Sequence, residues 1–270
     1  MMSSNVIVQN DVSTQENCQI YIAQNITDKI STVGRLNLDN VMLDGCGKTG
    51  FGNGAVSAEN VQNTNAFAST ITNSKFINSG SAGVYLNNTQ NIVVDSNLFL
   101  NNTNNSIIIT DLTTVPIAKP IQITNNYIVS TLESTSITTT SISSGILIQN
   151  LASFTYNANN LQVSGNVVSS GLGAAYISPA MACSGTLTNS LNFINNTAHS
   201  GSYGWIVTGY GSPCLTINGF VAYMMQEGLV TSGFYTSQSN GAIITAQNLL
   251  MTDNKVSVTL NGGFSGNQTQ

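Results

Sequence analysis

Charged side chains are scarce in this chain. Lys and Arg together number 6 and Asp and Glu 11 among 270 residues, which is 6%, whereas a typical domain has about a quarter. The single arginine, Arg35, and a net charge of −5 provide no basic cluster for a phosphate backbone, which argues against nucleic acid as a partner. Hydrophobic residues still make up 41%, so the chain can bury a core, and uncharged polar residues, including 37 Asn, must keep it soluble.

Long apolar runs are also absent. No stretch approaches the roughly 18 to 20 apolar residues that a membrane span requires, so we expect no membrane span in this chain. The first six residues contain neither the basic region nor the apolar stretch of a secretory signal peptide. Because other features indicate an extracellular or cell-surface location, we expect the chain to be an internal or incomplete piece of a larger secreted protein.

The residues that usually carry catalysis are few and scattered. A polysaccharide lyase needs a basic residue beside carboxylates, and the chain has only Arg35. A hydrolase needs converging carboxylates, and only Asp39 and Asp44 lie close in sequence. His199 is the only histidine, and no CxxC motif or His/Cys cluster indicates zinc. We therefore expect no enzyme, no metal site and no cofactor, with a lyase or hydrolase as the least favoured alternative.

A two-part repeat organises the chain. Its first half is an alternating strand that ends in Asn or another small polar residue and is followed by a second apolar stretch. The shortest spacings between successive units are 22 residues, from Asn73 to Asp95, and 23 residues, from Asn195 to Asn218. The first half recurs at Ile71–Phe76, Val93–Leu98, Ile121–Asn126, Leu161–Asn166, Leu191–Asn196, Leu215–Phe220 and Ile243–Asn248.

The second half follows about ten residues later, as a small residue and a short β-branched run. It is seen at Gly83–Leu86, Ser106–Ile109, Gly145–Ile148, Gly204–Val207 and Gly228–Val230. Short alternating strands that cannot close a core alone must stack on their neighbours. Stacked Asn side chains can then hydrogen-bond along the ladder, while stacked like charges would repel. The sequence therefore predicts an all-β, right-handed parallel β-helix (a solenoid), with a β-sandwich as the alternative.

The repeat predicts a single domain over residues 1–270, with an irregular part at 1–60 and regular coils at 61–270. One segment near the start, Leu36–Leu43, alternates well enough to form a coil. The segment Gly45–Gly54 contains five glycines in ten residues and is expected to be a loop.

The stretch Phe193–Trp205 contains the most specific pattern, in which Asn195, an Ala-His-Ser turn at 198–200 and Gly204 lead into a new strand. It resembles the parallel β-helix repeats of fibrocystin and fibrocystin-like receptors, and Asn218–Tyr223, followed by Glu227–Leu229, is similar to the next such repeat. The resemblance is good over residues 190–260 and implies a large surface or ciliary ectodomain without assigned catalytic residues.

Cysteines and glycosylation sequons bear on the cellular compartment. The four cysteines allow three pairings. Cys183 and Cys214 are about one turn apart, so stacking would bring them together in a disulfide, and Cys18 and Cys46 are similarly spaced. Acceptor sequences Asn-x-Ser/Thr occur at Asn25, Asn87, Asn101, Asn104, Asn195 and Asn267.

These observations favour an extracellular structural glycoprotein. We expect a module of a cell-surface coat, ciliary appendage or fibre that associates with copies of itself through the ends or faces of the β-helix. The alternative is an adhesin or receptor module that presents a strand face to glycans or proteins, with Tyr85 and Tyr203 as exposed contact residues.

Overall fold

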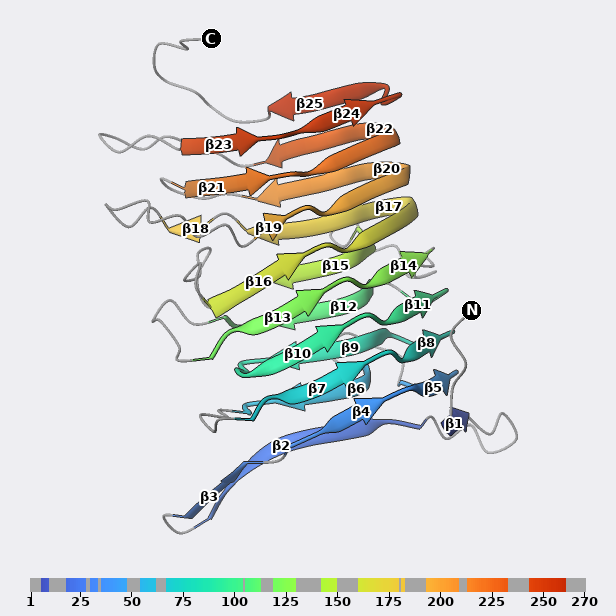
Figure 1. Ribbon diagram of the computed structural model, residues 1–270, viewed down its shortest axis with the longest axis vertical. Coiled ribbons are helices and arrows are strands. Elements are labelled where there is room, and N and C mark those ends of the chain that lie inside the picture. The colour runs from blue at the N-terminus through green and yellow to red at the C-terminus, as the bar shows by residue number, and fades with distance from the viewer. Residues whose placement is uncertain are drawn as a thin grey trace.

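A computed structural model shows a stack of three-sided coils made of short parallel strands (Figure 1). The structure describes residues 6–9, 18–27, 30–33, 35–47, 54–61, 67–103, 105–112, 119–129, 142–149, 160–179, 181–182, 193–208, 213–232 and 243–260. Each coil contributes one strand to each of three faces, which we name faces a, b and c in the order in which the chain meets them.

Face a is a parallel sheet in which each coil supplies one strand. Its strands are β4 (Asn37–Asp39), β7 (Ser69–Thr72), β10 (Ile92–Asp95), β13 (Ile121–Thr124), β16 (Leu161–Ser164), β19 (Phe193–Ile194), β21 (Pro213–Asn218) and β23 (Ile243–Gln247). The short strand β18 (Met181–Ala182) pairs with β21 in the antiparallel sense. We number the coils 1 to 8, beginning with the coil of β4.

Face b follows after a sharp corner. Its strands are β5 (Val41–Asp44), β8 (Lys75–Ile77), β11 (Leu98–Leu100), β14 (Tyr127–Val129), the first parts of β17 (Val167–Pro179), β20 (Thr197–Thr208) and β22 (Val221–Ser232), and β24 (Leu250–Thr252). In coils 5 to 7 the strand continues around the next corner, so that the last parts of β17, β20 and β22 lie on face c.

Face c completes each coil. Its remaining strands are β6 (Gly54–Glu59), β9 (Ala82–Asn87), β12 (Asn105–Thr110), β15 (Ser144–Gln149) and β25 (Val256–Leu260). Two strands precede coil 1: β1 (Val6–Gln9) pairs with β5 on face b, and β2 (Ile20–Thr27) pairs with β6 on face c. The end of β2 also forms an antiparallel hairpin with β3 (Ile30–Val33).

The strand register confirms the predicted parallel β-helix. Thr70 pairs with Val93, so that turn contains 93 − 70 = 23 residues, and Gln122 pairs with Gln162, so that turn contains 162 − 122 = 40. Insertions therefore lengthen a coil without shifting the stack. In Figure 1 the strands in front run left to right and those behind return, while the chain climbs from β4 to β25, which is a right-handed path.

Asparagine shapes the corners because it tolerates a positive φ better than most residues. The corner between faces a and b places its first residue in the left-handed region in coil after coil. These residues are Asn40, Asn73, Ser96, Asn125, Gly165, Asn195, Gly219 and Asn248. The repeated Asn that identified the unit in the sequence thus marks this corner.

The next residue of the same corner forms a buried asparagine ladder through coils 3 to 6. The Nδ2 of Asn97 donates to Oδ1 of Asn126 (3.0 Å), Asn126 to Asn166 (3.0 Å) and Asn166 to Asn196 (3.1 Å). Each Nδ2 also lies 2.8–2.9 Å from a carbonyl oxygen of face a in the preceding coil. Because every rung is satisfied, these polar groups can stay in the core. The predicted Asn ladder is confirmed, and it ends where Phe220 takes its place.

The core changes character in the upper coils. Trp205 and Tyr176 are both 1% exposed, and their rings lie 6.1 Å apart with Phe193 and Phe220 around them. The Trp205 Nε1 donates to Ser178 Oγ at 2.9 Å. Trp205 is therefore a core residue, and the aromatic cluster fills the space that the ladder leaves above coil 6.

Regular stacking begins earlier than the predicted boundary at residue 61. Strands β4, β5 and β6 pair in register with β7, β8 and β9 of the next coil. The irregular composition of this region arises from the glycine-rich connection between β5 and β6, which interrupts the repeat in the sequence and leaves the strands on either side in register.

Candidate interaction surfaces

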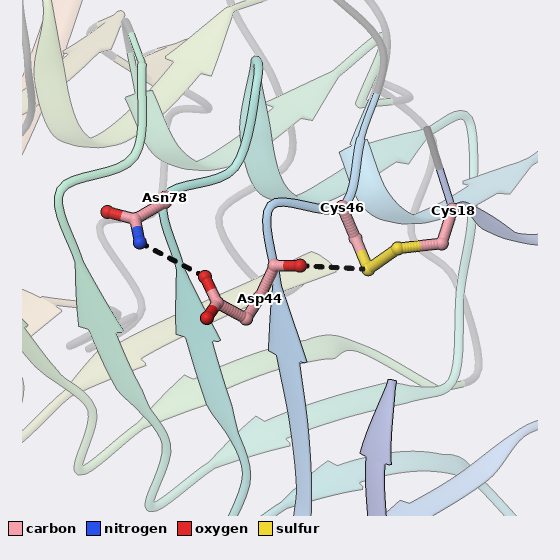
Figure 2. Close-up of a disulfide and its surroundings, with 4 residues drawn as sticks. All are labelled: Cys18, Asp44, Cys46 and Asn78. Atoms are coloured by element: carbon pink, nitrogen blue, oxygen red, sulfur yellow. Dashed lines mark hydrogen bonds between the residues drawn. A yellow bond between two sulfur atoms is a disulfide. The ribbon is translucent and has the colours of Figure 1, made fainter. Parts of the chain in front are cut away.

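The disulfide between Cys18 and Cys46 fastens β2 to coil 1. Its sequence separation is 28 residues, its Cα atoms lie 4.6 Å apart, and Cys46 is fully buried. The Gly47 amide donates to the Cys18 carbonyl oxygen at 2.7 Å, so the backbone also holds this junction. Figure 2 shows the bond beside the corner where Asn78 Nδ2 donates to Asp44 Oδ1 at 3.0 Å. The spacing of these two cysteines in the sequence indicated this contact correctly.

The second predicted disulfide involves Cys183, which lies outside the described residues. Cys214 belongs to β21, and its Cα is paired with that of Met181 in β18. The structure thus brings the segment that precedes Cys183 next to Cys214. The bond itself stays a prediction.

The predicted glycosylation residues occupy different settings. Asn101 and Asn195 are exposed at corners, with φ of 52° and 55°. Asn87 ends β9, and its Oδ1 is buried without a hydrogen-bond partner. Asn25 lies in β2, while Asn104 and Asn267 lie outside the described residues. Asn101 and Asn195 are therefore the accessible acceptors among the described side chains.

The carboxylates considered for catalysis lie on different faces. Asp39 points out from β4 on face a and Asp44 from β5 on face b. Hydrogen bonds from Asn73 and Thr72 hold the pKa of Asp39 below its usual range, which suits a carboxylate and not a proton donor. The exposed Arg35 lies 5.2 Å above the Phe67 ring and donates to the Ala68 carbonyl oxygen.

No group of three or more His, Cys, Asp or Glu side chains that could hold a metal ion occurs among the described residues. In the same part of the chain, no helix is long and apolar enough to cross a membrane.

One of the two aromatic contact residues is misplaced by the sequence reasoning. Tyr85 is only 6% exposed, although it points out from face c, and it packs with Ala82, Ile108 and Leu147. Tyr203 is partly exposed and packs against a second outer cluster, Ala174, Ile206 and Val230. The prediction that Tyr85 is an exposed contact residue is therefore wrong, because the outside of face c is itself covered.

Face a presents a polar exterior whose groups bond one another. Thr72 Oγ1 donates to Asp39 Oδ1 at 2.9 Å, and Asn125 Nδ2 donates to Asp95 Oδ1 at 2.9 Å. The side-chain amide of Gln122 donates to Gln162 Oε1 at 3.2 Å. Because these outward groups satisfy one another, face a is typical of a solvated sheet face.

Face b presents apolar side chains to the outside over coils 2 to 5. Its outward columns follow from the register, in which Leu98 pairs with Tyr127 and Leu100 with Val129. We call these outward residues the face b stripe, namely Ile77, Leu98, Leu100, Tyr127, Val129 and Val167. All are at least partly exposed, and Tyr127 is 46% exposed. An apolar exterior is unusual for a solvated sheet face and is typical of an interaction surface.

The hydrophobic core is open at the C-terminal end. Val258 and Leu260 of β25 continue two core columns, because they pair with Leu229 and Thr231 of the coil below. Leu229 is 2% exposed, whereas Val258 is 43% and Leu260 56% exposed. Within the described chain, β24 and β25 pair only with β22. The last coil therefore leaves both its backbone edge and its core side chains without a cover from these strands.

The N-terminal end exposes the same core columns from the other side. Ile20 pairs with Val56, which begins the column that runs through every coil to Leu229 and Val258. Ile22 pairs with Ala58 in the neighbouring column. Both isoleucines are only partly buried against the core. Each end of the stack thus shows a cross-section of one continuous core.

Comparisons with known proteins identify no family. No protein-family model matches the chain, and no curated protein matches it significantly. The similarity to fibrocystin repeats therefore stays a resemblance. Among solved structures, the chain is similar to the surface protein and adhesin PfbA of Streptococcus pneumoniae, with a TM-score of 0.35 and 14% identity over 97% of this chain and 82% of that one. The two backbones superpose only loosely, and the strand pairings themselves define the fold.

The sequence contained an overlooked signal for the face b stripe. Strands on face a alternate polar and apolar residues, as in Thr70-Ile71-Thr72. Face b strands instead contain apolar triplets, Leu98-Phe99-Leu100 and Tyr127-Ile128-Val129. A triplet without alternation indicates a strand whose two sides both prefer contact with apolar groups.

Proposed function

We propose that this protein is an extracellular structural module that associates head to tail with copies of itself. The observation that carries the proposal is the open core at both ends. Stacking one copy on another would place Ile20 over Val258 and Ile22 over Leu260, because these residues occupy the same columns. The new contact would repeat the coil-to-coil packing that holds the molecule together.

Physical chemistry supports this association. Burial of apolar surface contributes about 25 cal/mol per Å², and the unpaired strand edges of the two ends would gain hydrogen-bond partners. Contacts of this head-to-tail kind do not close on themselves and so produce filaments. The scarcity of charge reduces the repulsion between stacked copies.

The extracellular location is part of the proposal. The Cys18–Cys46 bond supports it, because disulfides persist chiefly in oxidising compartments. Glycans at Asn101 and Asn195 would project from exposed corners and leave the two ends accessible. We also propose that the chain is no enzyme, in keeping with the separation of Asp39 and Asp44 on different faces. The finer assignment to a ciliary appendage has only the resemblance to fibrocystin repeats in its favour.

Sedimentation velocity over a wide concentration range, with electron microscopy, tests the proposal. We expect the wild type to form linear oligomers that lengthen with concentration. Val258→Lys should abolish them, because a charge would enter the end-to-end contact, whereas Gln122→Lys on face a should leave them unchanged. A wild type that stays monomeric at the highest concentration, or a Val258→Lys variant that assembles like the wild type, would contradict the proposal.

A second candidate function is an adhesin or receptor module. The observation that favours it is the face b stripe, because an apolar exterior there has no structural purpose within one molecule.

A further inference from the structure

Two stacked rings stand on the outside of face b, above the stripe. His199 in β20 and Tyr223 in β22 are paired neighbours, and their rings are parallel within 10° with centroids 5.1 Å apart. Both side chains are partly exposed. The sequence pattern predicted His199 within a turn, but β20 continues through this position and the turn conformation falls on Ser200, whose φ is 55°.

The column of large side chains has a gap just below this pair. In the register, Ser169 pairs with His199 on one side and with Val129 on the other. Val129 and His199 are thus two coils apart, a distance of about 9.5 Å from backbone to backbone. Because Ser169 is small, the side of the imidazole that faces coil 5 has no ring against it, and the gap has roughly the thickness of one more ring.

A β-bulge borders the gap. Between Gly171 and Ala174 the register shifts, because β17 uses three steps where β20 uses two, from Gly201 to Tyr203. Gly171 has a φ of 59°, and a Cβ added there would meet no atom within 4 Å, so the space beside it is open. The extra residue includes Leu172, which is turned outward and is 72% exposed. Bulges of this type often redirect a side chain toward a binding site.

We propose that Ser169, His199 and Leu172 form a subsite for one pyranose ring of a neutral glycan. The apolar face of the sugar would lie on the imidazole, in the position that another ring would take in the stack. Leu172 would contact the rim of the sugar, and Ser169 Oγ would bond a hydroxyl group from below. This subsite is independent of the head-to-tail assembly, because it lies on a lateral face.

The surrounding chemistry selects a neutral sugar. The outward columns of face b contain no Lys, Arg, Asp or Glu in coils 3 to 7, so nothing there would pair with a uronate or a sulfate. His199 Nδ1 lies 3.2 Å from Ser200 Oγ, which leaves Nε2 to bond a sugar hydroxyl. Desolvation lowers the pKa of His199, which keeps the ring uncharged at neutral pH.

Titration followed by NMR of the His199 imidazole tests this subsite. The probes are cellohexaose, laminarihexaose, mannohexaose and maltohexaose, with the hexamer of galacturonic acid as the charged comparison. We expect at least one neutral oligosaccharide to shift the His199 resonances in a saturable way and the charged one to have no effect. If no neutral oligosaccharide shifts them, or if the charged one binds more tightly, the proposal is wrong.

Two variants and a matched control locate the binding. His199→Ala should weaken binding about tenfold, because it removes the stacking surface. Ser169→Tyr should abolish binding, because the chain's own ring would fill the gap. Thr252→Tyr adds a ring at the other end of the same column, beyond Tyr223, and should leave the affinity unchanged. Unchanged affinity in folded Ser169→Tyr and His199→Ala would overturn the subsite. Val258→Lys should still bind, since lateral binding does not require assembly.

Discussion

The two ends of the coil stack carry the same core columns but are secured differently. At the N-terminal end, β2 is fastened to coil 1 by the Cys18–Cys46 bond, and Ile20 and Ile22 are partly buried. At the C-terminal end, the outermost strand pairings join β24 and β25 to β22 alone, and Leu260 is 56% exposed. Terminal coils have one neighbour where internal coils have two, so they open first. The difference teaches that this chain protects one end with a covalent bond and leaves the other to a partner.

Removal of the N-terminal disulfide should have the largest effect on this contrast. In the chain-entropy model, whose mechanism is disputed, a loop of this size stabilises by about 3.5 kcal/mol. We expect Cys18→Ser with Cys46→Ser to lower the free energy of opening of coil 1 by that order. Hydrogen exchange of the β2 and β6 amides measures it, with the β22 and β25 amides as an internal control. Equal loss of protection at both ends would show that the bond stabilises the whole stack and not its first coil.

The predicted bond between Cys183 and Cys214 could break the contrast. The two residues are 214 − 183 = 31 positions apart, so a bond would stabilise by a similar amount, about 3.5 kcal/mol. We expect peptide mapping under non-reducing conditions to recover the fragments of Cys183 and Cys214 joined. Two alkylated free thiols would instead leave the upper coils without a covalent fastening.

Core truncation at matched positions sharpens the comparison. Leu229 and Val258 are neighbours in one column, at 2% and 43% exposure. Leu229→Ala should lower the free energy of unfolding by about 3 kcal/mol, because it leaves a cavity. Val258→Ala should cost less than about 1 kcal/mol in the monomer, since less apolar area is lost. Urea unfolding at low concentration measures both. A large cost for Val258→Ala in the monomer would mean that the last coil is covered after all.

Much of this architecture was predictable because each feature recurs in every coil. The alternation at Thr70-Ile71-Thr72 predicted face a, and the repeated Asn predicted the buried ladder. The burial of Tyr85 was not predictable, because alternation determines which side a residue faces but not what covers that side. The gap at Ser169 depends on residues 30 positions apart, from Ser169 to His199, whose register the varying insertions conceal.

The smallest expected effect is a difference between lower and upper coils in acid. The folded-state pKa of His199 in coil 6 is lowered by desolvation from 6.5, and that of Asp39 in coil 1 is lowered from 3.8, chiefly by the hydrogen bond from Asn73. The unfolded chain takes up a proton first in both cases. Each group therefore contributes stability that is present above its unfolded pKa and is lost as the pH falls below that value.

The two groups act in different pH windows, so the two parts of the stack should respond in turn. As the pH falls below 6.5, the β20 and β22 amides should lose a little protection against hydrogen exchange, while those of β4 and β7 should do so only below 3.8. Solvent screening keeps both effects small, because both groups are exposed for the most part. His199→Gln should remove the first step and leave the second. Simultaneous loss of protection in all four strands would show that the stack opens as one unit and that its ends are not independent.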